Sequence, residues 1–169
     1  MKRRSVRSKT KARKVKPVPA GYHTVTPYLA CGDAARAIDF YKKAFGAAEV
    51  MRMPGPDGKI AHAEVKIGGS RVMLTDEYRE MDFLSPLTRG GTTVHMHLYV
   101  ADVDKMADRA VGAGAKLLHP VQDKFYGDRT GTVRDPFGHV WHIATHTEDL
   151  SMAELRKRGE KALKEIGDG

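Results

Sequence analysis

The chain has 169 residues, of which 41% are hydrophobic and 30% are charged, a composition typical of a globular protein with one domain or two small repeated units. No apolar run approaches the roughly 20 residues that a membrane-spanning helix needs, so we expect no membrane partner. The single cysteine, Cys31, excludes an internal disulfide and predicts a cytoplasmic location.

The net charge of +8 arises at the N-terminus. Residues 1–16 hold nine of the 29 Lys and Arg residues and no acid, which leaves 20 basic against 21 acidic residues in the rest. This composition predicts a disordered tail and linker over residues 1–20, without the apolar segment that directs secretion. Such a tail could contact nucleic acid through phosphates, but a solubilising extension without a partner is the interpretation that we favour.

A first set of elements follows the tail in the order strand, helix and three strands. Asp33 is an expected helix N-cap, and Gly46 an expected helix end. The paired glycines 68–69 predict a hairpin between two alternating strands. The predicted strands cover residues 23–30, 49–53, 60–67 and 71–75, and the helix covers residues 34–45.

The same order begins again after a linker at residues 79–91. Asp33 precedes the second expected N-cap, Asp102, by 69 positions, and Gly46 precedes Gly114 by 68, which indicates an internal repeat. The predicted strands of this second set cover residues 92–100, 116–118, 130–134 and 139–146, with an irregular hairpin at 121–126 and a helix from 103 to about 112.

We therefore predict an α+β fold made of two β-α-β-β-β units, at residues 21–78 and 92–148. A helix covers one face of each curved mixed sheet, so the other faces should bound a concave cavity. A C-terminal helix within residues 149–169, with Ser151 and Glu154 as a capping box, should cover a sheet edge or join a dimer contact.

The strand at residues 92–100 carries the most suggestive polar residues. Alternation places His95, His97 and Tyr99 on one face, where two imidazoles and a phenol could bind a metal, move protons or hold a polar ligand. An ordinary solvated strand face is the alternative. In the last strand, Trp141 should point into the core, and His139 should lie in solvent near the strand end.

Three segments together resemble the vicinal-oxygen-chelate superfamily of glyoxalases, bleomycin-resistance proteins and extradiol dioxygenases. They are AIDFYKKAFG at residues 37–46, VADVD at 100–104 and DPFGH at 135–139. IAHA at 60–63 with VMLTD at 72–76 is similar to the PhnB-like branch. The resemblance spans about residues 23–147 and implies a glyoxalase-like fold.

The resemblance also implies four metal-ligand positions, which here hold Thr26, Met73, His95 and His142. Imidazoles suit a divalent Zn, Ni, Mn or Fe ion, whereas threonine and methionine are poor ligands, so the site is incomplete or holds no metal. A third ligand would have to come from His97, His62 or Glu64.

These residues leave the chemistry open. A glyoxalase-like lyase or isomerase could use a metal, or it could use His95 and His142 as acid and base without one. The alternative is a metal-free binding or antibiotic-sequestering protein of the bleomycin-resistance kind. The resemblance implies a homodimer and a small-molecule ligand in the cavity. Candidate ligand contacts are Tyr28, Met73, His97, Tyr99, Tyr126 and Arg129.

Overall fold

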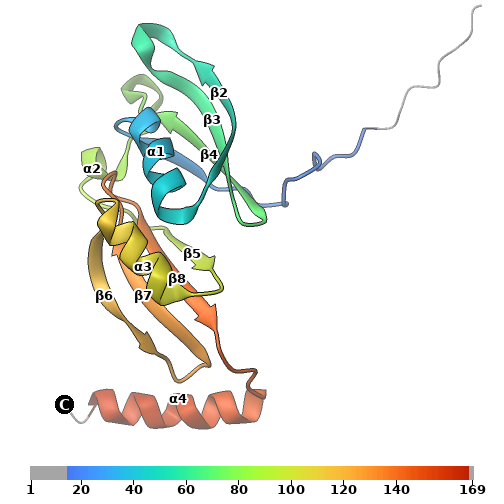
Figure 1. The fold of residues 1–169 in the computed structure, drawn as a ribbon, viewed down its shortest axis with the longest axis vertical. Coiled ribbons are helices and arrows are strands. Elements are labelled where there is room, and N and C mark those ends of the chain that lie inside the picture. Colours follow the sequence, from blue (N-terminus) through green and yellow to red (C-terminus); the bar gives the residue numbers. More distant parts are fainter. Residues whose placement is uncertain (1–14, 168–169) are drawn as a thin grey trace, which may run out of the picture.

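The chain forms the predicted α+β fold, with one four-stranded mixed sheet in each unit (Figure 1). The computed structural model describes residues 15–167, so most of the predicted tail lies outside the described residues. The first sheet has the strand order β1-β4-β3-β2 and the second has the order β5-β8-β7-β6. In both, the first strand is parallel to its neighbour and the other pairs are antiparallel.

The first unit comprises β1 (Tyr28–Cys31), α1 (Ala34–Phe45), β2 (Ala48–Pro54), β3 (Ile60–Ile67) and β4 (Ser70–Asp76). The second comprises β5 (His95–Tyr99), α3 (Val103–Gly112), β6 (Lys116–Asp123), β7 (Asp128–Arg134) and β8 (Val140–His146), and α4 (Met152–Gly167) follows it. No helix within residues 15–167 is long and apolar enough to cross a membrane.

The register of the two sheets confirms the internal repeat. Tyr28 lies opposite Met73 in the first sheet, and His97 lies opposite His142 in the second. Both members of the second pair are 69 positions after their counterparts, which is also the offset between Asp33 and Asp102. Each of these aspartates caps its helix, because its carboxylate accepts a hydrogen bond from the backbone N–H three residues later.

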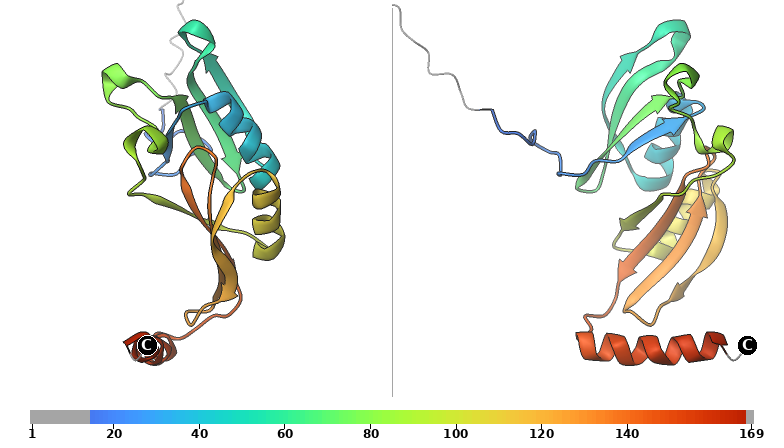
Figure 2. Two further views of the ribbon diagram at one scale, coloured as in Figure 1. Left: turned by 90° about the vertical axis from the view of Figure 1, so that its left-hand side faces the viewer. Right: turned by 180° about the vertical axis from the view of Figure 1, so that it is seen from behind.

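Both units share one core on the helix side of the sheets. The helices α1 and α3 pack against each other and lie on the same side of the molecule, so the uncovered faces of both sheets lie on the opposite side (Figures 1 and 2). Trp141, 2% exposed, packs its ring 4.7 Å from Phe45 and 5.4 Å from Tyr41. The prediction that Trp141 is a core residue is confirmed.

Two strands are shorter than predicted because local hydrogen bonds replace the ladder at their starts. Before β1, the Thr26 hydroxyl donates to the His23 carbonyl, and before β5, Thr92 exchanges hydrogen bonds with Val94. By contrast, β6 is one strand where two pieces were predicted. Its pairing with β7 shifts register on both sides of His119, beside Pro120, which has no N–H to donate.

The inter-unit linker contains structure that the sequence patterns did not predict. Short helices run over Arg79–Met81 and Pro86–Arg89, and the side chain of Ser85 caps the second of them (α2). A further single turn covers Pro56–Gly58 between β2 and β3. Each is too short to show a helical periodicity in the sequence.

The prediction that His139 lies in solvent is wrong. His139 is only 7% exposed, and its Nε2–H donates to the backbone carbonyl of Ala30, 3.1 Å away in the other unit. Burial lowers the pKa of this imidazole. The contact exists because the last strand of the second unit begins against β1, which no periodicity in the sequence indicates.

Candidate functional site

Four imidazoles gather on the uncovered face of the second sheet. We call this surface the histidine face, defined by His95, His97, His119 and His142. The register places His97, His142, Thr132 and His119 on successive neighbouring strands, so that they form one row across the sheet. Burial and the nearby imidazoles of His95, His97 and His119 lower the pKa of His142, which favours its neutral form.

His95 and His142 are in direct contact on this face. Nδ1 of His95 lies 3.0 Å from Nε2 of His142, and Nδ1 of His142 lies 3.0 Å from the hydroxyl of Thr132. Two neutral imidazoles can share one proton across such a contact, and the hydroxyl of Thr132 can either donate or accept. Both tautomers of the pair therefore have their hydrogen bonds satisfied.

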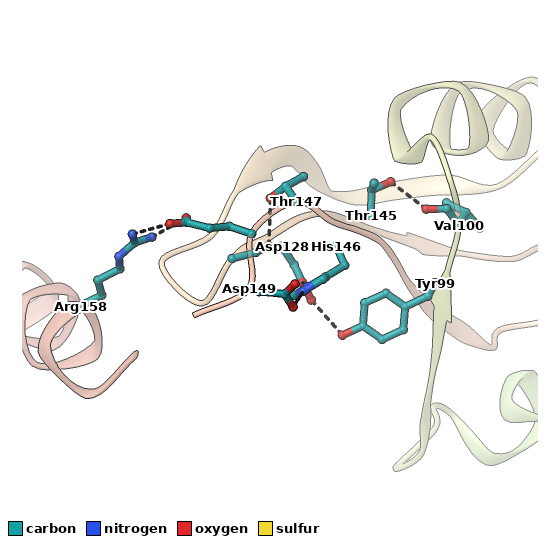
Figure 3. A network of polar contacts seen from close by, with 10 residues as sticks. Tyr99, Val100, Asp128, Thr145, His146, Thr147, Asp149 and Arg158 are labelled. Carbon is teal, nitrogen blue, oxygen red and sulfur yellow. Dashed lines mark hydrogen bonds and ion pairs between the residues drawn. The ribbon is translucent and has the colours of Figure 1, made fainter. Parts of the chain in front are cut away.

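A second polar group adjoins the histidine face at the ends of β5, β7 and β8 (Figure 3). The Tyr99 hydroxyl donates to Oδ2 of Asp128 at 2.9 Å, and the ring of Tyr99 lies 4.7 Å from the ring of His97. Nδ1 of His146 lies 2.7 Å from Oδ1 of Asp128, and its Nε2 lies 3.0 Å from Asp149. These two carboxylates raise the pKa of His146.

The uncovered face of the first sheet has a different polar centre. Glu64, 3% exposed, accepts hydrogen bonds from the Tyr22 hydroxyl at 2.5 Å and from Nη1 of Arg71 at 2.6 Å. These bonds lower the pKa of Glu64 although burial opposes them. On the same face, Nδ1 of His62 lies 3.1 Å from the hydroxyl of Tyr28. The acidic side chain of this face is therefore already satisfied within the chain.

The structure brings some of the predicted site residues together and separates others. His95, His97, His142 and Tyr99 share one surface, whereas Tyr28 and Met73 belong to the other sheet. Two further predicted ligand contacts are Tyr126, in the turn between β6 and β7, and Arg129, in β7. Tyr126 is 38% exposed beside Phe125, and Arg129 points away from the imidazoles and binds Asp104 of α3 at 2.7 Å.

Sequence reasoning missed His119, Thr132 and Asp128. Alternation along residues 130–134 could have placed Thr132 on the polar face. His119 was hidden because Pro120 beside it interrupts the strand pattern, and Asp128 because it follows Gly127 in a segment that was interpreted as a loop.

A family model for the glyoxalase/bleomycin resistance protein/dioxygenase superfamily matches residues 22–143, which is most of the chain. The chain belongs to this superfamily. Membership confirms the resemblance that the sequence motifs indicated, and it explains the tandem units.

Proteins of two mycobacteria are similar over most of the chain. Mb0911c of Mycobacterium bovis is 44% identical over 86% of this chain and 95% of its own, and Rv0887c of Mycobacterium tuberculosis is 44% identical over 86% and 85%. Among solved structures, TioX from Micromonospora sp. ML1 is 31% identical with a TM-score of 0.57, covering 76% of this chain and all of TioX.

The superfamily's four metal-ligand positions do not form a conventional site here. His95 and His142 are suitable donors, but their near nitrogens face each other. Thr26 and Met73 lie in the other unit, and the hydroxyl of Thr26 bonds to a backbone carbonyl. Nor do the described residues contain any group of three or more His, Cys, Asp or Glu side chains that could hold a metal ion. Within one chain, the donor set does not fit the metal.

A cavity also lies elsewhere, at the junction of the two units. Its volume is about 670 Å³, and it is lined by β1, the inter-unit linker and the start of β5. Tyr28 is the only predicted ligand contact that lines it, and the histidine face does not contribute. We place the candidate chemistry on the histidine face, because the acid–base groups converge there, rather than in this cavity.

Proposed function

We propose that the protein is a proton-transfer enzyme of the isomerase or lyase type that acts on a small carbonyl compound at the histidine face. His95 would act first as the general base and then as the general acid, supported by His142 and without a metal. The observation that supports this proposal is the 3.0 Å contact between the two imidazoles, with Thr132 on the far nitrogen of His142. The donor set described above gives no reason to route a step through a metal ion.

The proposed step begins with His142 donating its Nδ1–H to Thr132 and accepting the Nδ1–H of His95 at its Nε2. In that tautomer Nε2 of His95 is unprotonated, and the His95 side chain is exposed to a ligand. Nε2 removes a proton from a carbon that carries a hydroxyl group beside a carbonyl group. The C–H electron pair forms the C=C bond of an enediolate, and the carbonyl oxygen takes the negative charge. The hydroxyl proton moves to the former carbonyl oxygen, and the imidazolium of His95 returns the first proton to the former carbonyl carbon. The other carbon becomes the new carbonyl group, so the isomerisation is complete without a net redox change.

His142 has a supporting role in this step. Its lowered pKa keeps it neutral, so that its Nε2 can accept the Nδ1–H of the transient His95 imidazolium and share the charge. Positioned acid–base groups of this kind contribute about 10²- to 10⁴-fold in rate.

Proton exchange tests the proposal directly. The full-length chain, dialysed against a chelator, is incubated in D2O with hydroxyacetone, and loss of the C1 and C3 proton signals is followed by NMR. We expect exchange above the buffer rate, and a loss of about 100-fold or more in His95→Gln and in His142→Gln. His23→Gln, on an exposed residue before β1, is the matched control. Exchange that persists in both site variants, or that appears only after metal is added, would refute the proposal.

Ligand binding without chemistry is the second candidate function. The exposed rings of Tyr99, 60% accessible, and Tyr28, 44% accessible, on the uncovered sheet faces favour it, because such rings supply stacking surface. Binding of an aromatic ligand that depends on Tyr99 and leaves the ligand unchanged, with no proton exchange on any carbonyl probe, would support this candidate over the enzyme.

We also propose that two copies form a homodimer through the uncovered sheet faces. Each chain leaves both faces open on one side, and the first face exposes Tyr28 and Met53, at 44% and 51%. Facing copies would place the polar centre of one sheet opposite the histidine face of the partner. Sedimentation equilibrium should give twice the chain mass, and Tyr28→Glu should shift the protein towards the monomer.

A further inference from the structure

Asp128 is a buried acid that the proposed proton transfer does not use. It is 4% exposed at the start of β7, and both of its carboxylate oxygens have partners. Oδ2 accepts the Tyr99 hydroxyl, and Oδ1 faces Nδ1 of His146 (Figure 3). An ionised carboxylate can only accept, so the imidazole nitrogen at one oxygen and the phenol at the other must both donate, which fixes the direction of both hydrogen bonds.

The direction of the Tyr99 bond determines what Tyr99 can offer a ligand. An ionised carboxylate only accepts hydrogen bonds, so the phenol must donate its single proton to Asp128. The lone pairs of the phenol oxygen remain, and the residue is 60% exposed. The hydrogen bond to Asp128 raises the pKa of Tyr99, which keeps the phenol neutral in the ordinary pH range. Tyr99 therefore presents an acceptor and no donor.

Tyr99 lies within reach of a ligand held at the acid–base pair. Its ring is 4.7 Å from the ring of His97, and the His97 ring lies 6.2 Å from that of His142 with nearly parallel planes. Roughly 13 Å of strand separates the Cα atoms of His95 and Tyr99, so a molecule with its reacting carbon at His95 reaches Tyr99 only if it extends across His97. A three-carbon probe cannot span both places and therefore reports on Tyr99 alone.

We propose that Tyr99 forms an acceptor subsite that selects ligands carrying a hydroxyl or amine donor, and that Asp128 is the positioning residue that sets this polarity. The proposal rests on the proposed function for the location of the ligand and names its substrate class: hydroxylated carbonyl compounds in preference to analogues without a donor.

The Asp128→Asn variant should change the Tyr99 hydroxyl from a hydrogen-bond acceptor to a hydrogen-bond donor towards the ligand. Below the pKa of His146 in the variant, both ring nitrogens of His146 carry protons, so the amide oxygen of the asparagine would face Nδ1–H and the amide NH2 would face Tyr99. The phenol would then accept from the amide and would turn its own proton towards the ligand. Asp149→Asn is the matched control, because Asp149 bonds the other nitrogen of His146, is fully exposed and does not contact Tyr99.

Two probes of similar size measure the preference. Hydroxyacetone carries a hydroxyl donor, and methoxyacetone has the same oxygens with that donor capped. Dissociation constants come from NMR titrations that follow the ring signals of Tyr99 and His97 in the full-length protein. One neutral hydrogen bond corresponds to a preference of about three- to tenfold for hydroxyacetone in the wild type. We expect the same preference in Asp149→Asn, no preference in Tyr99→Phe, and a lost or reversed preference in Asp128→Asn.

The outcomes separate this proposal from the proposed function. A wild-type preference that Asp128→Asn and Tyr99→Phe leave unchanged overturns the subsite, whatever the exchange assay shows. The absence of any Tyr99 or His97 shift with either probe overturns it as well. A preference that depends on Tyr99 and Asp128, found without proton exchange, supports the subsite while the enzymatic proposal fails. Tyr99→Phe keeps the test decisive if Asp128→Asn does not fold, because it leaves the buried carboxylate in place.

Discussion

Removal of a single hydroxyl group, in Tyr41→Phe, should weaken the junction between the two units. Tyr41 lies on α1 of the first unit and is fully buried, and its hydroxyl donates to Oδ2 of Asp135 at 2.8 Å in the turn before β8. Asp135, 4% exposed, also accepts from Trp141 Nε1 at 3.0 Å and from the backbone N–H groups of Phe137 and His139, each at 2.9 Å. The phenol is thus the donor that reaches this carboxylate from the other unit.

The expected cost follows from the charge on the acceptor. A hydrogen bond to a charged group contributes about 1.5–3 kcal/mol to stability, and three donors remain on Asp135 after the substitution. We therefore expect Tyr41→Phe to lower the free energy of unfolding by about 2 kcal/mol. The phenylalanine ring keeps the packing against Trp141, so no cavity cost is added. At roughly 2–4 °C per kcal/mol for a chain of this length, the melting temperature should fall by about 4–8 °C.

Urea denaturation followed by the fluorescence of Trp141, the only tryptophan in the sequence, measures this loss at a site 5.4 Å from the changed ring. The midpoint should fall while the slope stays constant. Tyr126→Phe, at a residue 38% exposed, is the control and should leave the midpoint unchanged. If the free energy of unfolding of Tyr41→Phe is within about 0.5 kcal/mol of the wild-type value, the idea that this hydrogen bond joins the units is refuted.

Two further predictions concern the end of the second sheet. Gly127 has φ of +89°, and a Cβ there would overlap the carbonyl oxygen of Glu148. Gly58 has a similar φ of +75° but open space around it. Gly127→Ala should therefore lower the free energy of unfolding by about 1–3 kcal/mol more than Gly58→Ala does. Urea midpoints compare the two, and equal losses would contradict the overlap. The pKa of His146 is raised by Asp128 and Asp149, so the stabilisation should be complete below the unfolded pKa of about 6.5 and lost as pH rises through the higher folded value. The difference in melting temperature between wild type and His146→Gln should therefore be largest near pH 5.5 and shrink above pH 6.5; a difference that grows with pH would contradict this assignment.

Much of the fold follows from local patterns in the sequence. The helix α1 has the predicted bounds, because Asp33 and Gly46 mark its ends and its buried side chains recur at helical spacing. The strands β3 and β7 were found by alternation and turn signals. The predicted starts of β1 and β5 were wrong because the side chains of Thr26 and Thr92 form hydrogen bonds to the nearby backbone, and hydrophobic periodicity does not show such bonds.

The candidate site was predictable only in part. Alternation and the family resemblance singled out His95 and His142, and the structure places them 3.0 Å apart. Neither pattern could show that Arg129 is bound by Asp104 of α3, or that Asp128 holds Tyr99. These partners are 25 and 29 residues apart in the sequence, and they meet only because the strand ends and α3 lie side by side.

The sequence by itself determined the repeated β-α-β-β-β order, the helix caps and the facing of each strand, because hydrophobic period and capping act within a few residues. The tertiary structure decided which polar groups became neighbours. It buried His139 against Ala30 of the other unit, and it aligned four imidazoles on one uncovered surface. Parallel pairing of β5 with β8 joins residues 45 positions apart, so the contact between His95 and His142 depends on a register that only the folded sheet defines.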